Sequence, residues 1–91
     1  MRQERAEGIA IQALSHIASD NDLLGRFMET TGLALEELRE AASEPGFLSA
    51  VLTFLRQDEP ECLCFSSNAG ISPIDIQSAA MTLEGHRDDF L

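Results

Sequence analysis

The 91-residue sequence contains no tryptophan, no tyrosine and no lysine, and it has only three prolines. Tyrosine and tryptophan are enriched in β-strands, and no apolar residues alternate with polar ones over a useful length, so strand signals are nearly absent. No apolar run approaches the roughly 20 residues that span a bilayer. The first ten residues, MRQERAEGIA, lack the apolar region of a signal peptide. We therefore expect a helical, cytoplasmic protein that does not enter a membrane.

Basic residues are also scarce, because 16 acidic residues stand against six arginines and give a formal net charge of −10. Such a charge keeps a protein in solution and repels nucleic acid and anionic membranes at long range. It favours a basic partner surface, although a solvated acidic exterior explains the same composition. The charge therefore predicts neither a nucleic-acid partner nor a membrane partner.

Cysteine occurs only as Cys62 and Cys64. On a helix, side chains two positions apart point about 200° away from each other, which is too divergent for a disulfide. A metal site would need further Cys or His ligands, and the segment ECLCF has none beside it. We expect two reduced thiols without metal, one facing the core and the other partly exposed.

Residues that could support catalysis are isolated from one another. Neither His16 nor His86 has a Cys, Ser or carboxylate at a catalytic spacing, so both are interpreted as surface or rim residues. The acidic clusters EELRE and QDEPE lack the alternating oxygen ligands of an EF-hand. The glycines are spread as helix terminators rather than gathered in a phosphate-binding loop. The sequence predicts no enzyme activity, no cofactor and no metal site.

Helical periodicity, in contrast, covers almost the whole chain. An apolar stripe predicts a first helix over about residues 3–19. Asp20 and Asp58 are N-cap residues for the second and fifth helices, and Ser72 precedes a first-turn proline at the start of the last one. A third helix is expected from about Leu35 to Ala42. The predicted boundaries lie near Gly32, Ser43, Asp58, Gly70 and Gly85, and residues 86–91 are expected to form a frayed tail.

The fourth helix has the widest apolar face in the chain, so it should form the centre of the core. That face consists of Phe47, Leu48, Val51, Leu52, Phe54 and Leu55.

A shift of 38 residues overlays the second half of the chain on the first. Seven positions are then identical: Gly8 and Gly46, Leu14 and Leu52, Asp20 and Asp58, Phe27 and Phe65, Gly32 and Gly70, Ala41 and Ala79, and Ala42 and Ala80. Shared helical periodicity explains part of this agreement, but paired turn glycines and capping aspartates are harder to obtain in that way. We interpret residues 7–44 and 45–82 as two copies of a three-helix unit. The predicted fold is a single all-α domain over residues 1–85, a compact bundle of five to six short helices.

Three phrases carry a resemblance to a known family: DNDLLGRFMETTGLALEELREAA, EPGFLSAVLTFLRQDE and AGISPIDI. With these the chain resembles the small, acidic, uncharacterised proteins of alphaproteobacteria that are grouped as domain of unknown function 3572. The resemblance extends from about Ala6 to Leu83. It implies an all-α fold and no particular activity, so no functional residues follow from it.

Two kinds of binding site are considered. Phe27, Phe54 and Phe65, with Phe47, are candidates for a groove between the two copies that an amphipathic partner helix or a second copy of the chain would fill. The alternative is that all four aromatic side chains belong to the core. We predict a non-catalytic protein-interaction or regulatory module, present as a monomer or weak homodimer.

The other candidate is a divergent helix-turn-helix protein that binds nucleic acid. Its recognition helix would run from Leu35 to Ala42, where three glutamates (36, 37 and 40) stand against Arg39. The second copy, Pro73 to Ala80, has Asp75 and no basic residue. A DNA-binding helix normally shows a basic stripe, so this candidate ranks second.

Overall fold

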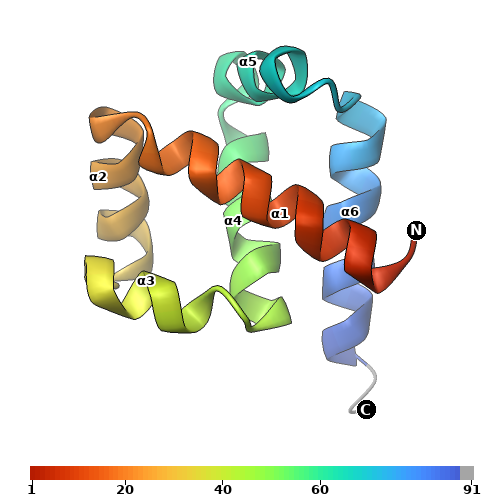
Figure 1. Ribbon diagram of the computed structural model, residues 1–91, viewed down its shortest axis with the longest axis horizontal. Helices are drawn as coiled ribbons and strands as arrows, with labels where there is room; N and C mark the ends of the chain where they lie inside the picture. Colours follow the sequence, from red (N-terminus) through yellow and green to blue (C-terminus); the bar gives the residue numbers. More distant parts are fainter. Residues whose placement is uncertain (89–91) are drawn as a thin grey trace.

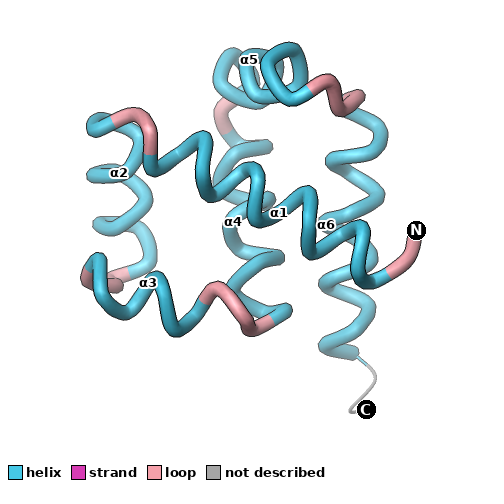
Figure 2. The backbone as a smooth tube through the Cα atoms, viewed as in Figure 1, coloured by secondary structure: helices cyan, strands magenta, loops and turns pink. Residues whose placement is uncertain are grey.

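The computed structural model describes residues 1–88, which form six α-helices joined by short loops (Figures 1 and 2). The helices are α1 (Gln3–Ala18), α2 (Asn21–Thr31), α3 (Leu35–Ala41), α4 (Pro45–Gln57), α5 (Glu59–Ala69) and α6 (Pro73–Asp88). No strand occurs within residues 1–88, so the predicted all-α class is confirmed. Over the same residues, no helix combines the length and the apolar character needed to cross a membrane.

Helix α4 lies at the centre of the molecule. It packs against α1, α5 and α6, and α1 and α6 also pack against each other. In Figure 1, α1 runs across the front of α4 and α6, while α2 and α3 lie to one side and α5 covers one end. The apolar face of α4 is the reason for this position, because Leu48, Val51, Leu52 and Leu55 are fully buried. The expected central role of the fourth helix is confirmed.

Helices α1 and α6 pack against each other, and both have completely buried alanines. Ala6, Ala10 and Ala13 on α1, and Ala79 and Ala80 on α6, have no exposed surface. The distance between two packed helices depends on the side chains at their contact, so alanines allow the two backbones to approach closely. The larger core side chains, among them those of α4, lie around this contact.

The three predicted N-caps are present. A carboxylate oxygen of Asp20 accepts hydrogen bonds from the backbone N–H groups of Asp22 and Leu23, at 2.9 and 3.3 Å. A carboxylate oxygen of Asp58 accepts one from Glu61 at 3.4 Å. The Ser72 hydroxyl oxygen accepts one from Asp75 at 3.2 Å. These short-range bonds explain why the sequence placed the helix starts well.

Glycine ends α2 and α5 as predicted, but it does not end α6. Gly32 and Gly70 adopt φ of 73° and 69°, and the apolar residues that follow them, Leu33 and Ile71, pack back on the core. Helix α6 instead continues through Gly85 to Asp88, so the predicted end at Gly85 is wrong. The residue after Gly85 is polar, and a glycine stop is stabilised by an apolar residue that folds back. Of the predicted tail, residues 86–88 are helical and 89–91 lie outside the described residues.

Candidate functional site

The three aromatic residues predicted to line a groove do not lie together on the surface. Phe27 is completely buried, so it belongs to the core and offers no surface to a partner groove. Phe65 is 2% exposed and also belongs to the core, where it lines a separate depression of about 350 Å³ between α1 and α5. Phe54 is only partly buried and lines a cleft. The physical reason is that Phe27 and Phe65 lie on the inward faces of α2 and α5, whereas Phe54 lies at the edge of the apolar face of α4.

The cleft consists of two neighbouring depressions along α4, and we call it the α4 cleft. The first has a volume of about 580 Å³ and the second about 430 Å³, and both are lined by Thr30, Phe54 and Gln57. The first depression is completed by Thr31, Phe47, Ser49, Ala50, Thr53 and Glu84. The second is completed by Arg26, Glu29, Asp58, Glu59 and Pro60. The cleft is thus formed by α4, the second half of α2, the start of α5 and Glu84 of α6.

Aromatic side chains give the α4 cleft a firm floor. The ring of Phe27 lies behind it and contacts the rings of Phe47 and Phe54 edge to face, with centroid distances of 5.8 and 5.1 Å. Edge-to-face pairs at such distances stabilise a fold beyond the area that they bury. Phe54 is therefore held in place from below while part of its ring faces the cleft.

The two threonines on the α2 wall have no free hydroxyl proton to offer a ligand. The hydroxyl of Thr30 donates to the backbone oxygen of Arg26 at 2.8 Å, and that of Thr31 donates to Phe27 at 2.9 Å. Both hydroxyl protons are therefore used within α2. A molecule in the cleft therefore contacts the side chains of Thr30 and Thr31 without receiving a hydrogen bond from either hydroxyl group.

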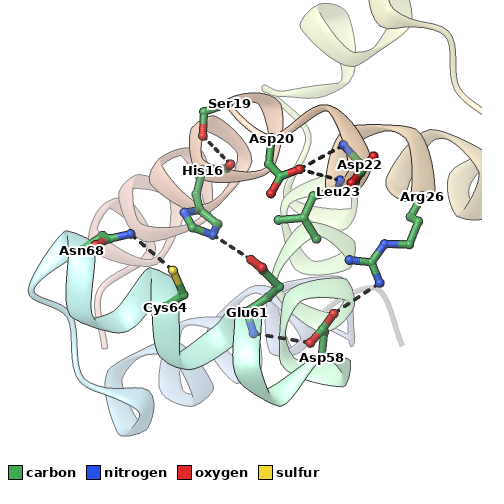
Figure 3. Close-up of polar contacts among 10 residues, drawn as sticks. All are labelled: His16, Ser19, Asp20, Asp22, Leu23, Arg26, Asp58, Glu61, Cys64 and Asn68. Atoms are coloured by element: carbon green, nitrogen blue, oxygen red, sulfur yellow. Dashed lines mark hydrogen bonds and ion pairs between the residues drawn. The ribbon is translucent and has the colours of Figure 1, made fainter.

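Acidic side chains surround the α4 cleft. Of the residues with described side chains, Glu29, Asp58, Glu59 and Glu84 line it together with one basic residue, Arg26. A guanidinium nitrogen of Arg26 lies 3.3 Å from one carboxylate oxygen of Asp58, while the other oxygen of Asp58 caps α5 (Figure 3). The cleft thus has four carboxylates against one guanidinium.

A second polar group links α1 to α5. Nε2 of His16 lies 3.3 Å from a carboxylate oxygen of Glu61 (Figure 3). The imidazole ring also packs against Phe65, with centroids 5.5 Å apart. The side chain of His16 is 15% exposed, which fits the rim position, one of the two alternatives expected from the sequence. Its contacts join two helices. The side chain of the other histidine, His86, lies outside the part of the chain whose side chains are described.

The two cysteines have the expected environments. Both are free, and Cys62 is partly buried against the core. Cys64 is exposed, and its sulfur accepts a hydrogen bond from the side-chain amide of Asn68 at 3.5 Å. Burial raises the pKa of the Cys62 thiol; the guanidinium of Arg56 opposes this shift and the carboxylate of Glu59 adds to it. Among the residues with described side chains, no three His, Cys, Asp or Glu residues are grouped so that they could hold a metal ion.

The helix-turn-helix candidate presents an acidic surface. Glu36, Glu37 and Glu40 on α3 are exposed, and one of them, Glu37, accepts a hydrogen bond from the backbone N–H of Ala34 at 3.0 Å. The single basic residue of this helix, Arg39, is also exposed. Helix α3 therefore has the geometry of a second helix after a glycine turn but carries the opposite charge from that of a DNA-binding helix.

Sequence reasoning identified Phe47 and Phe54 but missed the other residues of the cleft. Thr30, Ala50 and Gln57 are small or polar residues, and nothing in their local sequence distinguishes them from ordinary helix surface. One signal was present: Phe54 extends the apolar face of α4 beyond the width that the neighbouring helices cover. A partly exposed aromatic side chain at that edge marks the floor of the cleft.

The family described as protein of unknown function (DUF3572) matches residues 3–86 of the chain. No curated protein and no solved structure matches it.

Proposed function

The chain belongs to the DUF3572 family, whose function is not known, and we propose that it is a small non-catalytic protein-interaction module that binds its partner in the α4 cleft. The observation that carries this proposal is the position of Phe54. Its ring is fixed by Phe27 from below and remains partly open to solvent in the cleft, where it lines both depressions. Aromatic side chains in such partly enclosed positions are typical anchors of protein interfaces.

The arrangement of the other polar groups supports a role without catalysis. His16 and Glu61 bridge two helices outside the cleft, and Cys64 contacts only the amide of Asn68 among the polar groups described (Figure 3). We also propose that the protein acts in the cytoplasm, since two free thiols suit a reducing compartment. On this proposal the free protein is a monomer or weak homodimer.

The test changes the cleft without removing a core side chain. Ala50 is exposed and lines the cleft, so Ala50→Gln places a longer neutral side chain on the cleft floor. Ala18 is an exposed alanine at the end of α1, and Ala18→Gln is the matched control. Proteins captured from the native host by the wild type are identified, purified and mixed with each variant, and the dissociation constant is measured by calorimetry.

We expect a purified partner to bind the wild type and Ala18→Gln equally well. Ala50→Gln should bind at least tenfold more weakly, which corresponds to about 1.4 kcal/mol. Phe54→Ala should weaken binding further, and its melting temperature shows whether it is still folded. Equal binding to all four proteins would disprove the role of the α4 cleft.

The alternative function, nucleic-acid binding through α3, has its own measurement. At low salt, mixed DNA and RNA should not change mobility in the presence of micromolar protein, because α3 presents three exposed glutamates. A shift that weakens as salt is added would replace the protein-binding proposal with this alternative.

A further inference from the structure

The length of the α4 cleft limits what can lie in it. Its floor follows α4 from Phe47 to Gln57 and continues to Pro60 at the start of α5. Ten residues of α-helix rise by about 15 Å. A segment that lies along this floor therefore needs about ten residues if it is helical, which is close to three turns.

The walls determine the conformation of that segment. They come from α2, α4, the start of α5 and Glu84 of α6, all of which are helical or helix ends, and the hydroxyl protons of Thr30 and Thr31 are bonded within α2. The cleft thus has no strand edge to which an extended peptide could add. Buried backbone groups need partners, so the bound segment must form its own backbone hydrogen bonds. An α-helix is the conformation that does this.

The charge around the cleft determines the chemistry of the segment. Four carboxylates and one guanidinium leave three negative charges around an aromatic floor, within a protein whose formal net charge is −10. A second copy of this chain would bring the same negative charge to the contact. Basic side chains on a partner would instead meet Glu29 and Glu84, and the wider field of the protein would speed their encounter.

We propose that the α4 cleft binds a basic, amphipathic α-helix of about three turns from another protein, whose apolar side chains contact Phe47 and Phe54. This inference rests on the proposed function and names the class of its partner. Arg26 then has a defined effect: it is the one cation among the cleft residues that the structure describes, and it neutralises Asp58 at 3.3 Å. A basic partner helix competes with Arg26 for that carboxylate.

The experiment uses the full chain and peptides displayed on phage. A library of 14-residue peptides with randomised positions is selected on the wild type and counter-selected on Ala50→Gln, so that peptides bound only by general charge are removed. The enriched peptides are synthesised, and their dissociation constants are measured by fluorescence anisotropy at low and high salt. Circular dichroism shows whether they become helical on binding.

We expect enriched peptides with apolar residues at helical spacing and an excess of Lys and Arg. Their affinity should fall about tenfold or more when salt is raised from low to about 0.5 M, because salt screens exposed charges. Glu29→Gln combined with Glu84→Gln should weaken binding several-fold. Glu36→Gln combined with Glu40→Gln, which makes the same charge change on α3, should have little effect. Arg26→Gln should tighten binding, the reverse of what a merely structural role for Arg26 would give.

Three results would overturn the inference: no peptide specific for the open cleft, enriched peptides that are neutral or acidic, or equal weakening by the two double variants. These results are distinguishable from failure of the proposed function. A purified partner that depends on Ala50 and Phe54 but binds through a neutral or extended segment would disprove the basic helix and leave the cleft as the binding site. A partner indifferent to both residues would disprove the cleft itself.

Discussion

Residues 20–42 and residues 58–80 are built from the same local parts, 38 positions apart. Each begins with a capping aspartate, continues with an 11-residue helix that buries one phenylalanine, and turns at a glycine with positive φ. Each then starts another helix with a residue buried at its fourth position, Leu38 in α3 and Ile76 in α6. Up to this point the two segments differ little.

They differ in what the last helix does. Helix α6 has 16 residues and packs against both α1 and α4, whereas α3 has seven residues and lies beside α2 at one side of the molecule (Figure 1). The two alanines that follow the buried residue are completely buried in α6 but only partly buried in α3. Helices α3 and α6 thus lie in different environments although their local sequences are similar. The duplication itself stays a prediction, but the environments of its proposed copies are clearly unequal.

The largest effect should come from comparing the two leucines that occupy equivalent positions. Leu52 on α4 is completely buried, while Leu14 on α1 is partly buried at the edge of the core. Leu52→Ala should cost about 2–5 kcal/mol of the free energy of unfolding, because it leaves a cavity. At about 4–8 °C per kcal/mol, the melting temperature should fall by about 10 °C or more.

Leu14→Ala should lower the melting temperature by less than half as much, because its side chain loses fewer contacts. Glu36→Ala, at an exposed position on α3, should change it by about a degree and serves as the control. Similar melting of the two leucine variants would show that α4 is no more central than α1.

Hydrogen exchange should separate α3 from α6. An isolated helix of seven residues is unstable in water, and α3 has one buried side chain, Leu38, to hold it. Its amides should therefore exchange by local opening, at a free energy at least about 2 kcal/mol below that of the α6 amides next to Ile76. Native-state exchange followed by NMR measures both. Equal protection of the two helices would mean that α3 unfolds only with the whole domain.

The preceding predictions expect the two segments to differ, whereas substitutions of their turn glycines should have equal effects on stability. Gly32 and Gly70 have nearly the same φ, and an added Cβ would meet nothing within 4 Å at either position. Gly32→Ala and Gly70→Ala should each cost about 1–2 kcal/mol, since the left-handed conformation is strained for alanine. Gly25→Ala, within α2 and also without a close neighbour, should stabilise the protein by about 0.5–1 kcal/mol. Unequal costs in chemical denaturation would show that tertiary contacts reach one of the turns.

The smallest effect concerns Cys62, which holds in α5 the position that Leu24 holds in α2. Burial keeps the pKa of its thiol above the ordinary value, so the folded state holds the proton more tightly than the unfolded chain does. The resulting stabilisation is present below about pH 9 and is lost as pH rises through the folded-state pKa. Between pH 8 and pH 10.5, the melting temperature of the wild type should therefore fall slightly more steeply with pH than the melting temperature of Cys62→Ala.

The matched thiol on the same helix gives the control. Cys64 is exposed, so it should react with iodoacetamide faster than Cys62 does at pH 8. Mass spectrometry of partly alkylated protein measures both rates. Equal rates would show that Cys62 is not shielded.

Local chemistry explains which features could be predicted. Asp20, Asp58 and Ser72 accept hydrogen bonds from backbone groups two or three residues away, and Gly32 and Gly70 act on the turn in which they lie. Such interactions are complete within a few residues, so the sequence shows them directly. Gly85 is the exception, because a glycine ends a helix reliably only when the following residue folds back on the core.

The sequence by itself determined the helical class, the helix boundaries at Asp20, Gly32, Asp58, Gly70 and Ser72, and the excess of negative charge. Tertiary structure alone decided which phenylalanine faces solvent. Phe27, Phe54 and Phe65 lie on the apolar faces of three different helices. Periodicity shows which face of its own helix each residue occupies, but it does not show which other helices cover that face. Packing of α1, α5 and α6 around α4 buries Phe65, and the edge contact of α2 with α4 buries Phe27 beneath Phe54. Burial depends on neighbours that are distant in sequence, so the cleft exists only in the folded molecule.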